Sequence, residues 1–305
     1  MALFWKIAYI LMYILMNFCF INEVCATNNP KIIANRGGKG ELPENTIYAI
    51  KTVLEAGVDG VEIDLQLTKD NRVVLYNYKD LAIKTDCQGQ VKDLTYNEIL
   101  KCNAAYYFDP ENDNTFPRRG DLHKIPTLEE VLNIVLTGNN ILFIDLKSLP
   151  SKILIDEIAS ILDQKNAWNN IVFLSTKNIH LDYLNDKFPK AKTFEPRDQT
   201  NKRLLSLRNE GVCCCTNTNN EYVGFETHKS MMVEDVLTLG PLYTKVEFHL
   251  WDKNAIKCTK KSKGENVKIV FLGVNNELEY NQAKILGVYA VITDYPIKLL
   301  NSIDS

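Results

Sequence analysis

The chain has 305 residues and a formal net charge of −3. Because Lys and Arg form no run, the sequence excludes a protein that binds nucleic acid through a basic surface, and any anionic ligand must be held by local positive charge. The length suits either two domains or one α/β barrel.

Residues 1–26 have the pattern of a signal peptide. An apolar run follows Lys6 and ends at Ile21, and the residues after it fit a cleavage site behind Ala26. The run is shorter than the roughly 20 residues that cross a bilayer. We therefore expect export to a periplasm, an endomembrane lumen or the medium, with an N-terminal membrane anchor as the alternative. The mature chain, 27–305, is then expected to have no stable membrane span.

Two of the eight cysteines lie in the predicted signal peptide, which leaves six in the mature chain. An even number in an exported protein is compatible with disulfides. Cys87 and Cys102 bracket one loop-rich segment and are the favoured pair. The run Cys213–Cys215 cannot easily pair within itself, so a bond from one of its members to Cys258 is the second candidate.

The first predicted elements are a strand over residues 31–34, a glycine loop and a helix that Gly57 ends. The strand over residues 60–67 follows. Side chains alternate along a strand, so Glu62 and Asp64 point the same way and their apolar neighbours point the other way.

The strand over residues 141–147 repeats this pattern, with Asp145 and Lys147 on one face. Carboxylates on otherwise buried strands are costly unless a positive group meets them. Oxygen ligands of this kind suit a hard divalent cation such as Mg²⁺ or Ca²⁺. A metal site is therefore favoured over the alternative, a solvated edge strand.

Between these strands, a strand over residues 72–77 precedes a segment, about 80–125, that looks like an insertion. Thr127 and Glu130 then form a capping box that opens a helix. The remaining predicted strands are 171–175, 192–196, 222–226, 245–251, 267–274 and 290–293, and the remaining helices are 153–165, 180–188, 203–209, 277–286 and one after Pro296.

Strands and helices alternate almost throughout, which predicts a parallel α/β sheet. About eight such units in this length favour a closed barrel over an open sheet. The chemistry of such barrels lies at the carboxyl ends of the strands. The predicted acidic residues and Lys147 all lie near strand ends of this kind.

Six short motifs in order resemble the glycerophosphodiester phosphodiesterase family. They are Asn35-Arg36-Gly37, Pro43-Glu44-Asn45-Thr46, Glu62-x-Asp64, Thr68-Lys69-Asp70, Asp145-x-Lys147 and Thr293-Asp294-x-Pro296. The resemblance implies a TIM-type (β/α)8 barrel with a small insertion after the second strand. It also implies a divalent cation, Ca²⁺ or Mg²⁺, and hydrolysis of glycerophosphodiesters to glycerol 3-phosphate and an alcohol.

Carried over by residue, Glu62, Asp64 and Asp145 match the metal ligands of the family. The family usually has Glu at the last of these positions, so Asp145 reaches one methylene less far. Two other residues, Arg36 and Lys147, match the groups that hold the phosphate, which agrees with their charge chemistry.

Glu44 lies in the family's signature near the metal and is expected to support the site. The sequence departs from the family at the two catalytic histidines, whose positions hold Asn35 and Asn77. An Asn side chain can bind a phosphate oxygen but cannot give or take a proton near neutral pH, whereas histidine does both.

The resemblance therefore implies a protein of phospholipid and glycerophosphodiester metabolism that keeps its metal and phosphate site but is weakly active or inactive. Its expected partner is a glycerophosphodiester or a phospholipid headgroup. The alternative is an active phosphoric diester hydrolase with a rearranged acid/base pair or a different substrate. Among the four histidines, His228 and His249 are the weak candidates for such a rearrangement.

Overall fold

The computed structural model describes residues 29–213, 220–237 and 240–303. Eight parallel strands form a ring in the order β6-β5-β4-β2-β1-β11-β10-β7. A parallel bridge between Phe194 and Tyr222 joins the two ends of the ring. The strands are β1 (Lys31–Ala34), β2 (Gly60–Leu67), β4 (Ile141–Leu146), β5 (Ile171–Leu174), β6 (Lys192–Thr193), β7 (Tyr222–Glu226), β10 (Lys268–Leu272) and β11 (Ala290–Thr293).

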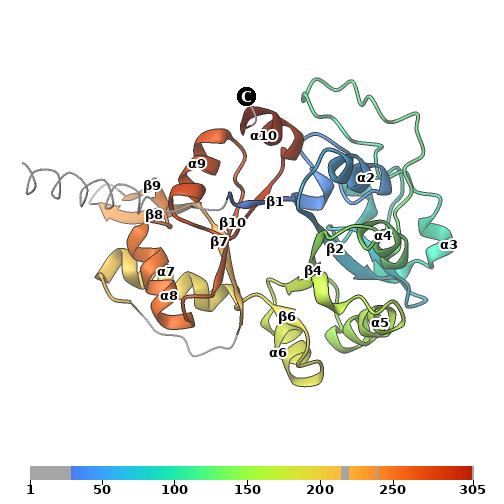
Figure 1. Ribbon diagram of the computed structural model, residues 1–305. Coiled ribbons are helices and arrows are strands. Elements are labelled where there is room, and N and C mark those ends of the chain that lie inside the picture. The colour runs from blue at the N-terminus through green and yellow to red at the C-terminus, as the bar shows by residue number, and fades with distance from the viewer. Residues whose placement is uncertain (1–28, 214–219, 238–239, 304–305) are drawn as a thin grey trace, which may run out of the picture.

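Helices cover the outside of this ring, which confirms the predicted TIM-type barrel (Figure 1). Outer helices connect most pairs of successive barrel strands, as the right-handed β/α pattern requires. The described helices are α2 (Ile47–Glu55), α3 (Tyr96–Ile99), α4 (Leu128–Val135), α5 (Ser151–Gln164), α6 (Asn178–Lys187), α7 (Arg197–Glu210), α8 (Lys253–Lys263), α9 (Glu277–Ile285) and α10 (Pro296–Ile303). None of the helices in these ranges has the length and apolarity needed to cross a membrane.

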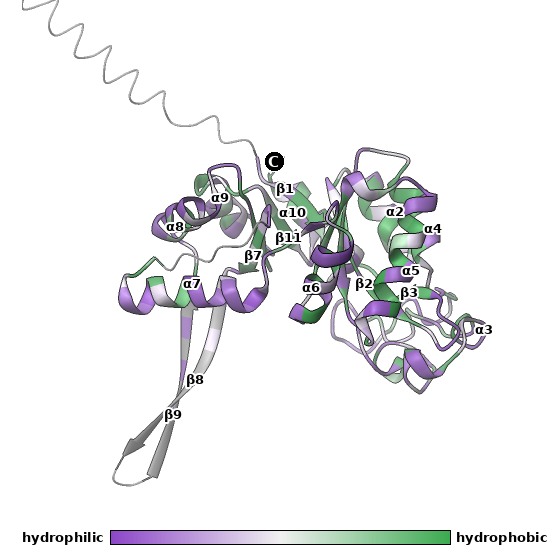
Figure 2. Cartoon of the chain, turned by 90° about the horizontal axis from the view of Figure 1, so that it is seen from below, coloured by the Kyte–Doolittle hydropathy of each residue, from purple (hydrophilic) through white to green (hydrophobic). Residues whose placement is uncertain are grey.

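Two apolar layers stabilise the barrel. One lies inside the ring and contains Ile33, Phe143 and Val270, and the other lies between the strands and the outer helices. Figure 2 shows this distribution, with apolar residues on the central strands and polar residues on the outer faces of the helices. Ile50 and Val53 are buried in the outer layer, on the face of α2 that packs against the strands.

Strands β2 and β4 are neighbours in a register that pairs Asp64 with Asp145. Their close approach depends on Gly60, since a Cβ atom there would lie 2.1 Å from the carbonyl oxygen of Ile141. Both strands are therefore confirmed as predicted, and the acidic residues of one lie beside those of the other.

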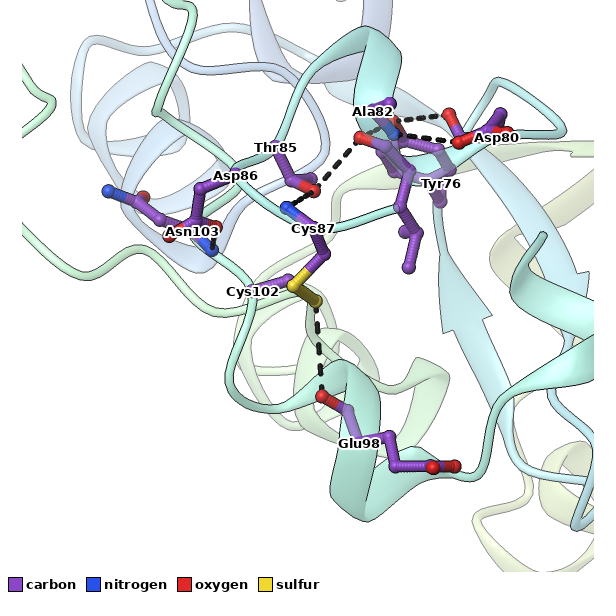
Figure 3. The surroundings of a disulfide bond; sticks show 10 residues. Tyr76, Asp80, Ala82, Thr85, Asp86, Cys87, Glu98, Cys102 and Asn103 are labelled. Carbon is purple, nitrogen blue, oxygen red and sulfur yellow. Dashed lines mark hydrogen bonds between the residues drawn. A yellow bond between two sulfur atoms is a disulfide. The ribbon is translucent and has the colours of Figure 1, made fainter. Parts of the chain in front are cut away.

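The predicted strand 72–77 is shorter in the structure, β3 (Val73–Leu75), and it runs antiparallel to β2 outside the ring. The segment 80–125 then forms two single turns, α3 and a long loop around its own small apolar cluster. The Cys87–Cys102 disulfide is present, as predicted, and Figure 3 shows it joining the stretch between the two single turns to the residues just after α3.

The region between β7 and α8 differs most from the sequence-based expectation. Strands β8 (His228–Leu237) and β9 (Gly240–His249) form an antiparallel hairpin that is separate from the barrel sheet (Figure 1). Only the second of these strands had been predicted. The second disulfide joins Cys258 to Cys213, which confirms that bond and selects the first cysteine of the run.

A buried ion cluster joins the segment after β6 to α7 and α8. Glu195 is 1% exposed and accepts a hydrogen bond from Arg203, while the ammonium of Lys263 lies 2.7 Å from the same carboxylate oxygen. Its other oxygen accepts a hydrogen bond from Thr200 at 2.8 Å. Both oxygens of this buried carboxylate are therefore bonded.

The predicted signal peptide lies outside the described residues, and Cys214 and Cys215 do too.

Candidate metal and phosphate site

The three predicted metal ligands converge at the carboxyl ends of β2 and β4. Glu62, Asp64 and Asp145 are all buried, and each offers an oxygen within 4.8 Å of the other two. Because the strand register pairs Asp64 with Asp145, the shorter side chain of Asp145 still reaches the cluster. We call these three residues the acidic triad.

Asp64 is the centre of the acidic triad and is 1% exposed. Its Oδ2 accepts a hydrogen bond from Asn45 Nδ2 at 2.9 Å and lies 3.0 Å from Arg36 Nε. Its Oδ1 lies 3.0 Å from the ammonium of Lys147, which also pairs with Asp145. The two predicted phosphate-binding residues therefore contact the acidic triad directly.

The loop after β1 brings two groups of Arg36 to the site. Its backbone N–H donates to Glu62 Oε2 at 3.0 Å, and its Nη1 donates to Glu44 Oε1 at 3.1 Å. Arg36 has a φ of 52°, in the left-handed region that side chains of this kind rarely adopt. Strained backbone of this kind is concentrated at functional sites. The structure places Glu44 beside Arg36, which is consistent with the predicted supporting role.

The site holds more negative charge than its neighbours neutralise. Burial, together with Asp64 and Asp145, raises the pKa of Glu62 well above its usual range. Burial also raises the pKa of Asp145 to about 6, with Lys147 limiting the rise and Asp64 adding to it. Conversely, burial opposes the charge of Lys147, but the acidic triad outweighs this effect and raises the pKa of the ammonium.

These residues fit a divalent cation. Asp145 Oδ1 is buried and accepts no hydrogen bond in the described structure, whereas Asp64 Oδ1 is buried with the ammonium of Lys147 at 3.0 Å but without hydrogen-bond geometry. A buried carboxylate oxygen without a donor is costly, and a cation bound there would remove that cost. The donors are all oxygen atoms, as Mg²⁺ and Ca²⁺ prefer.

The two positions predicted for the family histidines differ in their surroundings. Asn35 lies in the cavity of the acidic triad, and its Nδ2 donates to Asp294 Oδ1 at 2.6 Å. Asn77 follows β3 and is partly buried. The side chain of Gln66 on β2 donates to the carbonyl oxygens of Tyr76 and Tyr78, at 2.7 and 2.6 Å. These two residues flank Asn77, so the backbone at Asn77 is fixed to β2.

A cavity of about 320 Å³ contains the acidic triad and several residues that the sequence-based prediction did not assign. Arg197 pairs with Glu226 through one nitrogen at 2.6 and 2.7 Å from its two oxygens. Asp294 accepts from Asn35 and lies 3.4 Å from Lys39 Nζ. Each carboxylate ends or follows a barrel strand, which is the signal that could have identified it.

Ser175 and Asn45 were also not assigned. Ser175 lines the same cavity, and its Oγ lies 2.8 Å from His180 Nδ1. His180 is fully buried and its Nε2 lies 2.9 Å from the carbonyl oxygen of Ser148. No histidine lines the cavity within the described ranges, and His228 and His249 instead face each other at the base of the hairpin.

The structure is an eight-stranded β/α barrel with a buried acidic triad and two cationic side chains at the carboxyl ends of its strands. This is the arrangement that a barrel enzyme acting on phosphate esters with a metal ion would use. A sequence profile of the glycerophosphoryl diester phosphodiesterase family matches residues 36–298, and the chain belongs to this family. The family is metal-dependent and acts on glycerophosphodiesters.

Relatives in bacteria are similar over most of the chain. The uncharacterized protein Rv2277c of Mycobacterium tuberculosis is 31% identical over 271 residues, which are 89% of this chain and 89% of that protein. The crystal structure of its glycerophosphoryl diester phosphodiesterase domain has a TM-score of 0.80 and 28% identity, and the match covers 90% of this chain and all of that one.

A glycerophosphodiester phosphodiesterase of Bacillus altitudinis is 40% identical over 119 residues, 39% of this chain and 45% of that protein. The fold is shared with an Oleispira antarctica phosphodiesterase that was crystallised with the product sn-glycerol-3-phosphate, at 20% identity and a TM-score of 0.66 over 90% of this chain and 97% of that one.

Proposed function

We propose that this chain binds a glycerophosphodiester or a phospholipid headgroup at its acidic triad and hydrolyses it weakly or not at all. Glu62, Asp64 and Asp145 hold the divalent cation, Ca²⁺ or Mg²⁺, and Arg36 and Lys147 hold the phosphate. The cation supplies positive charge that polarises a phosphoryl oxygen. Glu44 keeps the guanidinium of Arg36 in place through its 3.1 Å contact.

The observation that carries this proposal is the pair of amides at positions 35 and 77. Cleavage of a phosphodiester requires one group that takes a proton from the nucleophile and one that gives a proton to the leaving alkoxide. The amide of Asn35 is already bonded to Asp294 and can do neither. Each lost acid or base lowers the rate by about 10²–10⁴-fold, so binding persists where turnover is largely lost.

Binding and turnover can be measured on the same protein. We expect glycerophosphocholine to bind in the presence of Ca²⁺ or Mg²⁺, to be hydrolysed slowly or not at all, and to lose binding in Glu62→Ala. Robust hydrolysis that Glu62→Ala abolishes would contradict weak catalysis.

Introducing histidine at positions 35 and 77 tests whether the two amides account for the weak hydrolysis. The double variant Asn35→His/Asn77→His is expected to raise the rate of glycerophosphocholine hydrolysis by at least about 100-fold, because both proton carriers return. The single variant Asn35→His is the matched control and should gain less. An unchanged rate in the double variant would show that the two amides do not account for the weak activity.

One pair of residues favours the second candidate, an active phosphoric diester hydrolase with a rearranged acid/base pair. Ser175 lines the cavity and bonds to His180, whose pKa burial lowers so that the ring is neutral. Ser175 also accepts a hydrogen bond from the backbone N–H of Lys177 at 3.0 Å, a local turn that fixes the serine in place before α6. If turnover is robust, loss of at least about 100-fold in His180→Gln with an intact fold would assign the proton transfer to this pair.

We also propose that residues 1–26 are a signal peptide and that the mature protein is exported to a periplasm, an endomembrane lumen or the medium, where it acts in phospholipid and glycerophosphodiester metabolism. Mass spectrometry of the protein from its native host should give an N-terminus at Thr27. A retained Met1 in a membrane fraction would support the alternative, an N-terminal anchor.

A further inference from the structure

A second cavity, of about 370 Å³, lies beside the acidic triad and is lined by four lysines, Lys79, Lys92, Lys147 and Lys177. We call it the lysine pocket. Lys147 lines both cavities, so the two are neighbours. No carboxylate is among the described residues that line the lysine pocket. The pocket is therefore locally positive, although the whole chain has a net charge of −3.

Lys147 is paired with Asp64 and Asp145 of the acidic triad, but the charges of the other three lysines of the pocket are weakly compensated. Lys177 donates to the backbone carbonyl oxygen of Lys147 at 2.9 Å, which is a neutral partner. Lys92 lies 3.4 Å from Asp93, but both side chains are 59% exposed, and ion pairs this exposed contribute little. Over the described part of the chain, Lys79 forms no ion pair. An anion in the pocket would therefore remove repulsion among these ammonium groups.

The lysines come from two separate parts of the fold. Lys147 and Lys177 follow β4 and β5 of the barrel. Lys79 and Lys92 flank a loop in the segment 80–125, and the N–H of Val91 donates to the carbonyl oxygen of Lys79 at 3.3 Å. The Cys87–Cys102 disulfide fixes this loop (Figure 3). The pocket thus lies between the insertion and the barrel mouth.

The polar groups of the pocket are mainly donors. Ser148 Oγ accepts from the backbone N–H of Leu67 at 3.0 Å, which leaves its own proton for an acceptor in the pocket. Ammonium and hydroxyl donors around a small cavity suit a compact group with several anionic oxygens. A phosphate monoester, with a charge near −2 and three acceptor oxygens, has this chemistry.

We propose that the lysine pocket binds a terminal phosphate group, either a phosphate monoester or inorganic phosphate. Its source is either a second phosphate on the headgroup whose first phosphate lies at the acidic triad, or a free phosphate ion. This inference rests on the proposed function only in placing the first phosphate at the acidic triad. In the first case Lys147 lies between the two phosphates, and the pocket selects headgroups that carry an additional phosphate.

The test compares two ligands that differ by one phosphate, inositol 1-phosphate and inositol 1,4-bisphosphate, by calorimetric titration of the mature chain in Mg²⁺. Neither ligand contains a phosphodiester, so the result does not depend on whether the protein is a hydrolase. The variant is Lys79→Gln/Lys177→Gln. The control is Lys101→Gln/Lys152→Gln, which removes the same charge from exposed lysines that do not line the pocket.

We expect the bisphosphate to bind at least about tenfold more tightly than the monophosphate in the wild type and in the control, because each charge-assisted hydrogen bond to an anion is strong. The ratio should fall to about two or less in Lys79→Gln/Lys177→Gln. Equal affinities in the wild type, or the same ratio in both double variants, would overturn the proposal.

Titration with inorganic phosphate then separates the two sources. Phosphate binding that is lost in Lys79→Gln/Lys177→Gln and kept in the control assigns the pocket to free phosphate. Phosphate binding that is equal in both, together with the lost bisphosphate preference, assigns it to a phosphate carried by the headgroup. If Glu62→Ala abolishes monophosphate binding while Lys79→Gln/Lys177→Gln does not, that loss is assigned to the acidic triad. It does not count against phosphate binding in the lysine pocket.

Discussion

Two buried charge clusters of this chain are built in opposite ways. At the barrel mouth, the three carboxylates of the acidic triad meet two cations, Arg36 and Lys147, and among the described residues no donor bonds to Asp145 Oδ1. Between β6, α7 and α8, the single carboxylate of Glu195 has both oxygens bonded. A bonded carboxylate stabilises the fold, whereas an excess of unbonded ones requires a ligand.

The pKa values express the same difference. Burial raises the pKa of Glu62 and of Asp145, so the fold favours their protonated forms when no cation is bound. Burial also opposes the charge of Glu195, but hydrogen bonds from Lys263 and Arg203 outweigh it and lower the pKa of that carboxyl. The two clusters should therefore respond in opposite directions to mutation and to pH.

The largest effect is expected from Glu195→Gln. Removing this charge leaves Arg203 and Lys263 buried without their anion, which should lower the free energy of unfolding by about 3–5 kcal/mol. Urea denaturation measures the loss, with Glu221→Gln as the control because that carboxylate is 58% exposed. Equal stability of both variants would mean that the buried cluster is not structural.

The second-largest effect is expected from pH, which should change the stability contributions of the two clusters in opposite directions. The pKa of Asp145 is about 6 in the folded chain and about 3.9 when unfolded, so its contribution to stability is present below about pH 4 and is lost as the pH rises through 6. In EDTA, ionisation of Asp145 should lower the free energy of unfolding by roughly 2–3 kcal/mol at pH 7 relative to pH 4. The contribution of Glu195 has the opposite sign and is lost as the pH falls below about 4.

The opposite pH dependences of these two contributions to stability can be separated by comparing the wild type with Asp145→Asn and with Glu195→Gln at each pH. The stability difference from Asp145→Asn should grow between pH 4 and pH 7, and that from Glu195→Gln should shrink below about pH 4. Parallel pH curves for all three proteins would contradict the opposite charge balance of the two clusters.

Asp145→Asn itself should have a smaller effect, which depends on the metal. In EDTA at pH 7 the variant should be up to about 2 kcal/mol more stable than the wild type, because one buried charge is gone while Lys147 keeps its contact with Asp64. In saturating Mg²⁺ the order should reverse, since only the wild type gains stability from the bound cation. A variant that is less stable in EDTA would show that Asp145 acts as a structural ion pair.

The smallest effect is expected at an exposed ion pair. Lys190 lies 2.6 Å from Asp163, a contact as short as those of the buried clusters, but both side chains are more than half exposed. Lys190→Gln should leave the denaturation midpoint unchanged within experimental error, because solvent screens such pairs. A clear loss of stability would mean that contact distance, rather than burial, decides the value of these pairs.

The sequence predicted the acidic triad because its information is local. Alternation along one strand placed Glu62 beside Asp64, and the second strand repeated the pattern at Asp145. The capping box of Thr127 and Glu130 is likewise confirmed, with hydrogen bonds of 2.7 and 3.3 Å. The barrel followed from alternating elements, since each strand and helix has its own periodicity.

The remaining features depend on contacts between distant residues. Asn35 bonds to Asp294, 259 residues away, and no local pattern reveals that pair. Helix α7 begins at Arg197, six residues before the predicted start, because its first turns are polar and show no apolar stripe. Strand β8 was not predicted because, among the strands the structure describes, it pairs with β9 alone, and neither of its faces has to follow the pattern of a barrel strand.

Cation binding by the acidic triad is the claim on which the proposed function depends. Calorimetric titration of Mg²⁺ or Ca²⁺ into the metal-free mature chain tests it directly, with Asp64→Asn as the variant and Glu221→Gln as the control. We predict one saturable site in the wild type and in the control, and none in Asp64→Asn. The absence of binding in the wild type, or equal binding in all three proteins, would contradict it.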